Sequence, residues 1–394
     1  MSTEVTMLDD TWRRFSEHIG ELGRALPSPP FPQSERETTD GYRYLTRLMV
    51  IGLQWAVEFG DPDFPAFYRH DDDVTKWGGP NVDNTYLRAR VRAENSYRIV
   101  GRRGTSHGFL ISECEGDMQL EQYGVYDEIW DDQLVTDDDG AFELIVSGER
   151  PPGYEGNWLR LHSNAGNITV RAYYNDWSRE TPPTVRIERI GGEGLSPPAL
   201  TPAEMARRID EARDWIVKSF HYWNRYVDNA YRKVGANVVI PPGAAQGGAK
   251  DIAYGFGFFR LADDEAYVIE GAPPTAWFWN IMLYNLGWME SLDFANRVTS
   301  LNGHQMQIDD DGRYRVVIAH RDPGLPNWLD TTGLHEGMIA TRYIRTSDVP
   351  PQTGQLVKFD QIHNLLAATP AMTVDQRRAQ IAIRQAHVAT RFRH

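Results

Sequence analysis

The feature that most constrains the fold is an apolar residue at every second position over two long stretches, residues 77–190 and 252–345. Successive side chains of a β-strand point to opposite faces, so this spacing predicts strands with one buried face. In TYLRARVR, for example, Leu87, Ala89 and Val91 alternate with three arginines. Several short segments of this kind are divided by Gly, Asp and Asn turns, which is typical of a β-sandwich or a β-barrel.

Helices are predicted outside these stretches. Apolar residues recur three and four positions apart in three segments: 9–26, 38–59 and 201–233. The third begins at a capping box of Thr201 and Glu204, with Pro202 at the first helical position. A last helix begins at a second capping box, Thr373 with Gln376, and is rich in arginine. Its arginines are expected either to face solvent or to form an arm onto a neighbouring acidic subunit.

We therefore predict a mainly β protein in which a long helix joins two β-sandwich domains, with helical segments at both termini. The predicted boundaries are a helical N-terminal cap at 1–76, a β-rich domain at 77–195, a bridging helix at 196–235, a β-sandwich at 236–350, for which the family resemblance described below implies a jelly-roll-like fold, and a C-terminal helical arm at 351–394.

Composition excludes several classes of partner. The chain has 394 residues, of which 41 are Lys or Arg and 55 are Asp or Glu, for a formal net charge of −14. A uniformly acidic protein is a poor ligand for nucleic acid or an anionic membrane. No apolar run approaches the ~18 residues of a membrane span, and the N-terminus has no signal-peptide pattern. With Cys114 as the single cysteine, we expect a cytoplasmic protein without disulfides.

The segment 320–337, HRDPGLPNWLDTTGLHEG, concentrates groups that carry out chemistry. It holds two His, two Asp, one Glu, one Asn and one Trp. In the strand before it, Tyr314, Val316 and Ile318 share a face with His320. His320 therefore ends a buried row and is expected to face the mouth of a β structure, where binding sites commonly form.

We predict that His320, Asp322 and Asp330 are catalytic, with Asn327 and Trp328 forming the wall of the site. Two carboxylates in unequal environments can divide the roles of general acid and general base. In the alternative interpretation, Asp322 and Asp330 only cap the two turns of the segment.

No cofactor or bound metal is predicted, because the sequence lacks GxSxG, HExxH and a phosphate-binding motif. The histidines do not occur four residues apart on a helix, which would mark a dedicated pair of metal ligands. A metal site assembled from His320, His335 and Asp322 is the alternative. Otherwise His335 is expected to contact substrate.

Three further segments are rich in aromatic and amide side chains. Residues 273–303 combine Trp279, Trp288 and Asn302, which would suit a stacking wall for sugar rings or other flat polar ligands. An aromatic core with capped turns is the alternative. Residues 77–89 are predicted to be a polar loop at the rim of a pocket, where Asn84 and Tyr86 would contact substrate, or else an Asx-rich turn. In residues 173–180, Asp176 and Trp177 are predicted to contact substrate, and a local ion pair is the alternative.

These motifs also resemble a known family. WGGPNVDNTYLRA, VRAYYNDWSRE, APPTAWFWNIMLYNLGWMESLDFANRVTSLNG and HRDPGLPNWLDTTGLHEG are similar to bacterial proteins with the domain of unknown function 1214. The resemblance covers most of residues 77–345. It implies a C-terminal jelly-roll-like domain after another β-rich domain, often in soluble oligomers, and no agreed activity. The recurrent polar positions of the family correspond here to Asn84, Tyr86, Asp176, Trp177, Trp288, Asn302, His320, Asp322, Asn327, Trp328 and Asp330.

Three functions are compatible with these features. We expect first a cofactor-independent hydrolase or lyase acting on a carbohydrate or glycoconjugate. The alternatives are a cofactor-independent enzyme acting on an apolar small molecule such as a lipid or steroid, and a non-catalytic binding or assembly protein. An open groove with flat tryptophans favours sugar, and a closed apolar cavity favours lipid. Many strand edges and the arginine-rich helix also predict a homo-oligomer.

Overall fold

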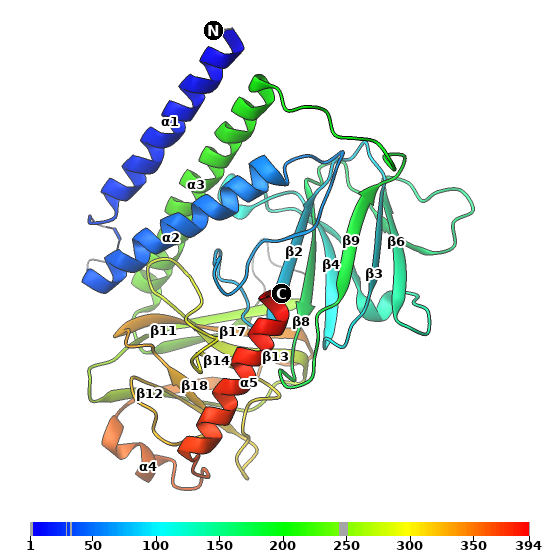
Figure 1. The fold of residues 1–394 in the computed structure, drawn as a ribbon. Coiled ribbons are helices and arrows are strands. Elements are labelled where there is room, and N and C mark those ends of the chain that lie inside the picture. Colours follow the sequence, from blue (N-terminus) through cyan, green and yellow to red (C-terminus); the bar gives the residue numbers. More distant parts are fainter. Residues whose placement is uncertain (1–2, 29, 32–33, 244–250, 394) are drawn as a thin grey trace. The chain divides into compact units, whose positions relative to one another are not determined.

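The computed structural model describes residues 3–28, 30–31, 34–243 and 251–393. Within these residues the chain forms four β-sheets and five α-helices, including helices at both ends (Figure 1). The predicted mainly β fold is therefore confirmed. None of the helices in this described part combines the length and the apolar composition that crossing a membrane requires.

The chain folds as two compact units that do not follow the five predicted segments. Unit 1 lies within residues 1–77, 84–173 and 181–225, and unit 2 within 78–83, 174–180 and 226–394. The N-terminal helices therefore belong to the same unit as the first β region, and the C-terminal helix to the same unit as the second. The long helix α3, Pro202–Val234, begins in unit 1 and ends in unit 2.

Besides the first part of α3, the described residues of unit 1 form two α-helices, one π-helical turn, nine strands and two 3-10 turns. They are α1 (Thr3–Ala25), α2 (Glu35–Leu53), the π-helical turn η1 (Gln54–Glu58), β1 (Tyr68–Arg69), β2 (Asn84–Arg90), β3 (Tyr97–Arg102), β4 (Gly108–Cys114), β5 (Val125–Trp130), β6 (Ala141–Ser147), β7 (Asn157–Arg160), β8 (Asn167–Tyr173) and β9 (Thr184–Arg189). Two short 3-10 turns, η2 (Met118–Leu120) and η3 (Asp131–Gln133), flank β5.

The strands of unit 1 form two sheets, in the orders β1-β2-β8-β4-β5 and β7-β6-β3-β9. The sheets meet where Phe109 stacks on Phe142, with ring centroids 5.6 Å apart. Arg88 departs from the predicted alternation, because it lies on the face expected to meet solvent and is nevertheless buried. Its guanidinium pairs with Asp117 at 2.8 Å and lies over the ring of Trp55, so η1 covers this part of β2.

Unit 2 contains the remaining elements of the described chain. They are β10 (Val238–Gly243), β11 (Ile252–Arg260), β12 (Glu265–Gly271), β13 (Ala276–Tyr284), β14 (Ser300–Asn302), β15 (Tyr314–Ala319), β16 (Trp328–Asp330), β17 (Glu336–Thr346), β18 (Gln352–Lys358), the 3-10 turn η4 (Phe359–Gln361), α4 (Ile362–Leu365) and α5 (Val374–Phe392).

Unit 2 is a sandwich of two sheets, with strand orders β10-β11-β17-β13-β14 and β16-β15-β12-β18. One core cluster joins the two sheets: Ile281 and Ile339 come from the first, and Ile269, Val316 and Ile318 from the second. All five side chains are fully buried, which is worth roughly 1.5–3 kcal/mol for each side chain. The apolar row predicted to precede His320 is thus confirmed as core.

The arginine-rich helix α5, red in Figure 1, directs three of its arginines into its own unit. Arg377, Arg384 and Arg391 are buried against the sandwich. Arg384 donates to the backbone oxygens of Phe294 and Ser300 and to the Ser300 hydroxyl. These three arginines therefore do not form the solvated face that was one of the two expectations, because they supply donors that buried oxygens need.

We predict that Arg384→Leu lowers the free energy of unfolding by about 2–4 kcal/mol, because it leaves three buried acceptors without a donor. Arg378→Leu on the same helix is the matched control, since Arg378 is 78% exposed and pairs only with Asp375. It should change stability by less than about 0.5 kcal/mol. Urea denaturation of both variants measures the difference, and equal effects would contradict the role given to Arg384.

A buried histidine makes unit 1 sensitive to acid. His70 is packed edge-on against Trp77 and Trp215, and its Nδ1 contacts the Tyr68 hydroxyl at 3.1 Å. Burial, with a smaller contribution from Arg88, lowers the pKa of His70 to about 3. The unfolded chain therefore binds a proton below pH ~6.5 that the folded chain does not take up until about pH 3.

Stability that depends on neutral His70 should accordingly be lost as the pH falls from 6.5 towards 3. We predict that the wild type loses about 2 kcal/mol more than His70→Phe between pH 7 and pH 5. Phenylalanine keeps an aromatic ring and removes the titrating group, so all other titrating groups are the same in the two proteins. Denaturant titrations at the two pH values test this, and parallel losses in both proteins would refute it.

Candidate functional site

His320 lies directly after β15, at one end of the sandwich of unit 2. The antiparallel pairing of β15 with β12 aligns Ala319 with Ala266, so the start of β12 lies beside His320. The pairing of β11 with β17 aligns Arg260 with Glu336, which places the end of β11 beside His335. The connection between β11 and β12 therefore passes both histidines, and it contains Asp263.

These three side chains form a cluster. His335 Nε2 lies 2.8 Å from Asp263 Oδ1, and the rings of His320 and His335 are 4.9 Å apart at their centroids. One nitrogen of each histidine and one oxygen of Asp263 lie within 4.8 Å of one another. The side chains of His335 and Asp263 are 61% and 94% exposed, so the cluster is open to solvent.

His320 is the inner member of the cluster. Its Nδ1 lies 2.7 Å from the Thr331 hydroxyl, whereas its buried Nε2 makes no hydrogen bond of standard geometry within the described residues. Burial, followed by the electrostatic influence of His335, lowers the pKa of His320, and an interaction with the backbone of Leu261 opposes this shift. The hydrogen bond from His335 lowers the pKa of Asp263. The cluster thus presents a neutral imidazole beside a histidine–carboxylate pair.

The two carboxylates predicted to be catalytic are held by turns and by arginines. Asp322 accepts the backbone N–H of Gly324 and pairs with Arg377 at 2.9 Å. Asp330 accepts the backbone N–H of Thr332 and pairs with Arg297 at 2.8 Å. Each carboxylate therefore caps its turn and neutralises an arginine, as the alternative interpretation proposed. The metal alternative needs the same revision, because Asp263 takes the place given to Asp322.

The predicted wall residues are also structural. Asn327 is buried and exchanges two hydrogen bonds with the backbone of Gln307, which fastens two loops together. The indole of Trp328 donates to the Ala319 oxygen, and the guanidinium of Arg377 lies 5.1 Å from its ring centre. These contacts set the course of the chain between His320 and His335 without exposing either side chain to a ligand.

The aromatic wall predicted in 273–303 is core. Trp279 and Trp288 are 7% and 1% exposed, and Trp279 packs against Tyr314 and Tyr343. A ring buried to this degree offers no face for a sugar to stack on, so the alternative of an aromatic core describes this segment.

Trp177 and Asn302 converge on Asp83, which the sequence analysis did not single out. The indole of Trp177 and the amide of Asn302 donate to Asp83 Oδ1 at 2.9 and 2.8 Å, and Asn280 donates to Oδ2 at 2.6 Å. Burial raises the pKa of Asp83, and the donated hydrogen bonds oppose that rise. This satisfied network, all within unit 2, fastens residues 78–83 and 174–180 to β13 and β14.

The remaining predicted residues have local partners. Asp176 accepts hydrogen bonds from the backbone N–H and the hydroxyl of Ser178, and these bonds lower its pKa. Asn84 and Tyr86 are on β2 of unit 1, opposite Tyr173 and Arg171 of β8.

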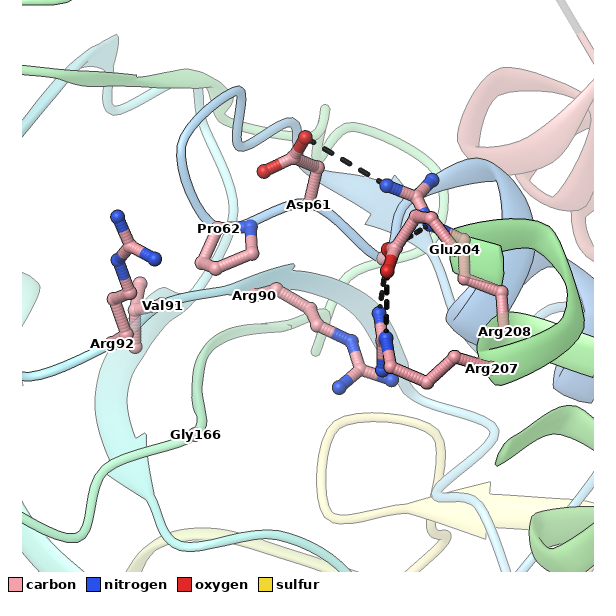
Figure 2. Close-up of a pocket in the computed structure, with 10 residues that line it drawn as sticks. Asp61, Pro62, Arg90, Val91, Arg92, Gly166, Glu204, Arg207 and Arg208 are labelled. Atoms are coloured by element: carbon pink, nitrogen blue, oxygen red, sulfur yellow. Dashed lines mark hydrogen bonds and ion pairs between the residues drawn. The ribbon is translucent and has the colours of Figure 1, made fainter. Parts of the chain in front are cut away.

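Unit 1 has a separate pocket of about 390 Å³ (Figure 2). Its lining residues are Gly60, Asp61, Pro62, Arg90, Val91, Arg92, Gly166, Glu204, Arg207 and Arg208. The four arginines are already paired with carboxylates: Arg90 with Glu211, Arg92 with Asp63, Arg207 with Glu204, and Arg208 with Glu204 and Asp61. The pocket is thus a charge-compensated recess, and it contains no histidine.

Asp263 and Asp83 are the two important residues that the sequence analysis missed. Asp263 follows a strand in LADDEAY, which has the composition of an ordinary turn. Its role depends on two strand pairings, and neither is visible in the local sequence. Asp83 was quoted within a polar loop, but its burial against two asparagines more than 190 positions away could not be anticipated.

Known proteins share the family and the fold of this chain. A sequence profile described as "Protein of unknown function (DUF1214)" matches residues 116–176 and 259–347. The solved structure of an uncharacterized protein from Burkholderia cenocepacia is 30% identical, with 90% of this chain and 99% of that chain covered and a TM-score of 0.84. A second solved structure, of a protein from Vibrio parahaemolyticus, is 14% identical, with 81% of this chain and 98% of that chain covered and a TM-score of 0.47. No curated protein matches the chain.

We predict that Asp83→Asn lowers the free energy of unfolding of unit 2 by about 2–4 kcal/mol. In the variant, the NH2 group of the new side chain would replace one carboxylate oxygen and would face at least one of the three N–H groups that now donate to Asp83. Asp176→Asn is the control, because Asp176 is partly exposed and lies in the neighbouring loop. Thermal and urea unfolding followed by tryptophan fluorescence measure both, and an unchanged Asp83→Asn protein would contradict the importance of the network.

Proposed function

Because the chain belongs to the DUF1214 family, whose description assigns no activity, we propose its function from its own side chains: it is a hydrolase or lyase acting on a polar substrate, with Asp263, His320 and His335 as the reaction centre. The observation that carries this proposal is the convergence of the three side chains within 4.8 Å. They come from three separate connections of the sandwich.

The arrangement supports activation of water. Three polar groups directed at one point can bind a water molecule and polarise it, and the Nε2 of His320 offers a lone pair there. In hydrolysis, the oxygen of that water forms the new bond to substrate, the bond to the leaving group breaks, and the proton passes to the cluster. In a lyase reaction, the same groups would take a proton from a substrate carbon, the electron pair of that C–H bond would form a double bond, and the bond to the leaving group would break.

Solvent exposure supports a polar substrate. His335 and Asp263 lie on an open surface, which admits a hydrophilic or polymeric molecule and gives an apolar ligand nothing to bury against. Carbohydrates and glycoconjugates remain the class to test first. Trp279, Trp288 and Trp328 are all buried, so a sugar would not stack on them.

The test is a substrate screen with glycosides, glycans, esters and lipids, followed by variants of the cluster. We predict that His320→Gln, His335→Gln and Asp263→Asn each lower turnover by about two orders of magnitude or more. Melting temperatures should change little for His335→Gln and Asp263→Asn, because both side chains are exposed.

Asp322→Asn and Asp330→Asn decide between this centre and the one predicted from sequence. If the cluster is the reaction centre, these two variants lose stability through their turns but keep most of their turnover per folded molecule. Loss of turnover in these two, with full activity in the cluster variants, would overturn the proposal. A screen without turnover or thermal shift for any substrate would favour a binding or assembly protein instead.

A further inference from the structure

We propose that Asp263, His320 and His335 bind a divalent transition-metal ion, of which zinc is the representative. The donor set consists of two imidazoles and one carboxylate, which leaves coordination positions open for water. This combination is found both in catalytic zinc sites and in non-haem iron sites. A role of the ion in activating water rests on the proposed function. Binding of the ion does not, because it requires no substrate.

The geometry fits a metal after a small adjustment. Zinc bonds of about 2.0–2.1 Å in tetrahedral geometry place ligand atoms roughly 3.3 Å apart. The donor atoms here lie within 4.8 Å of one another, so the widest pair has to close by roughly 1.5 Å. Asp263 is 94% exposed and lies in a turn, so its side chain can rotate to close that gap.

The inner ligand is prepared by its surroundings. A histidine that binds metal through Nε2 characteristically donates its Nδ1 proton to a neighbouring group, which fixes the tautomer and the ring orientation. His320 Nδ1 lies 2.7 Å from Thr331 Oγ1, and that oxygen is able to accept the proton. His320 Nε2 is buried and makes no hydrogen bond of standard geometry among the described residues, so this nitrogen is available as a ligand.

The strand ladders hold the ligands at a fixed separation. His320 and His335 end β15 and precede β17, and the backbone N–H of Leu261 donates to the His335 oxygen at 2.8 Å. The connection that carries Asp263 is thereby fastened to the segment that carries His335. Asp263 and His335 thus lie at the same end of the β11–β17 pair, and His320 follows β15, which pairs with β12 in the other sheet.

The experiment is titration of tag-free, chelator-treated full-length protein with Zn²⁺ by calorimetry, and with Co²⁺ followed by its visible absorption. We expect one ion per chain in the wild type. His320→Gln, His335→Gln and Asp263→Asn should each weaken binding by about tenfold or more. Asp264→Asn and His363→Gln are the matched controls, since both residues are exposed in the same unit and neither belongs to the cluster.

Two outcomes would overturn the inference: no stoichiometric binding, or binding that the three cluster variants leave unchanged, which would indicate adventitious surface sites. The result separates this inference from the proposed function. Stoichiometric binding without any turnover would support the site and oppose the activity. Turnover that depends on the cluster in a protein that binds no metal would support the activity and oppose the metal.

Discussion

The antiparallel pairing of β12 with β15 is the interaction on which the candidate site of unit 2 depends. Its register sets Ala266 opposite Ala319, and the adjoining ladder of β11 and β17 sets Arg260 opposite Glu336. A slip of one residue in either ladder would turn every side chain of that strand to the opposite face. The buried rows that join the two sheets oppose such a slip, so the hydrophobic core fixes the place where three polar side chains meet.

Buried charge is the second constraint, and it decides the roles of many polar residues. A charged group removed from water has to be paired or hydrogen-bonded, because its desolvation is otherwise too costly. Arg88 with Asp117, Arg384 with three oxygens, and Asp83 with three N–H donors all satisfy this requirement. Many of the polar side chains in the motifs that resemble the family therefore stabilise the interior of their own unit.

This distribution separates two kinds of polar residue within one segment. Between 320 and 337, Asp322, Asn327 and Asp330 have their hydrogen bonds satisfied by turns and arginines. His320 keeps a buried nitrogen without a hydrogen bond of standard geometry within the described structure, and His335 reaches solvent. The residues with remaining capacity to bind a ligand are thus the two histidines, together with an aspartate from another connection.

The sequence by itself determined the mainly β class, the long helix near 201–233, the final capping box and the apolar row that leads to His320. These follow from local periodicity and capping, which a single segment carries. It also identified His320 and His335 as functional candidates. Only the tertiary structure decided that Asp263 joins them, that Asp322 and Asp330 cap turns, and that the tryptophans are core. Those assignments depend on strand pairing and burial between distant segments, and no local pattern records which distant partner a side chain will meet.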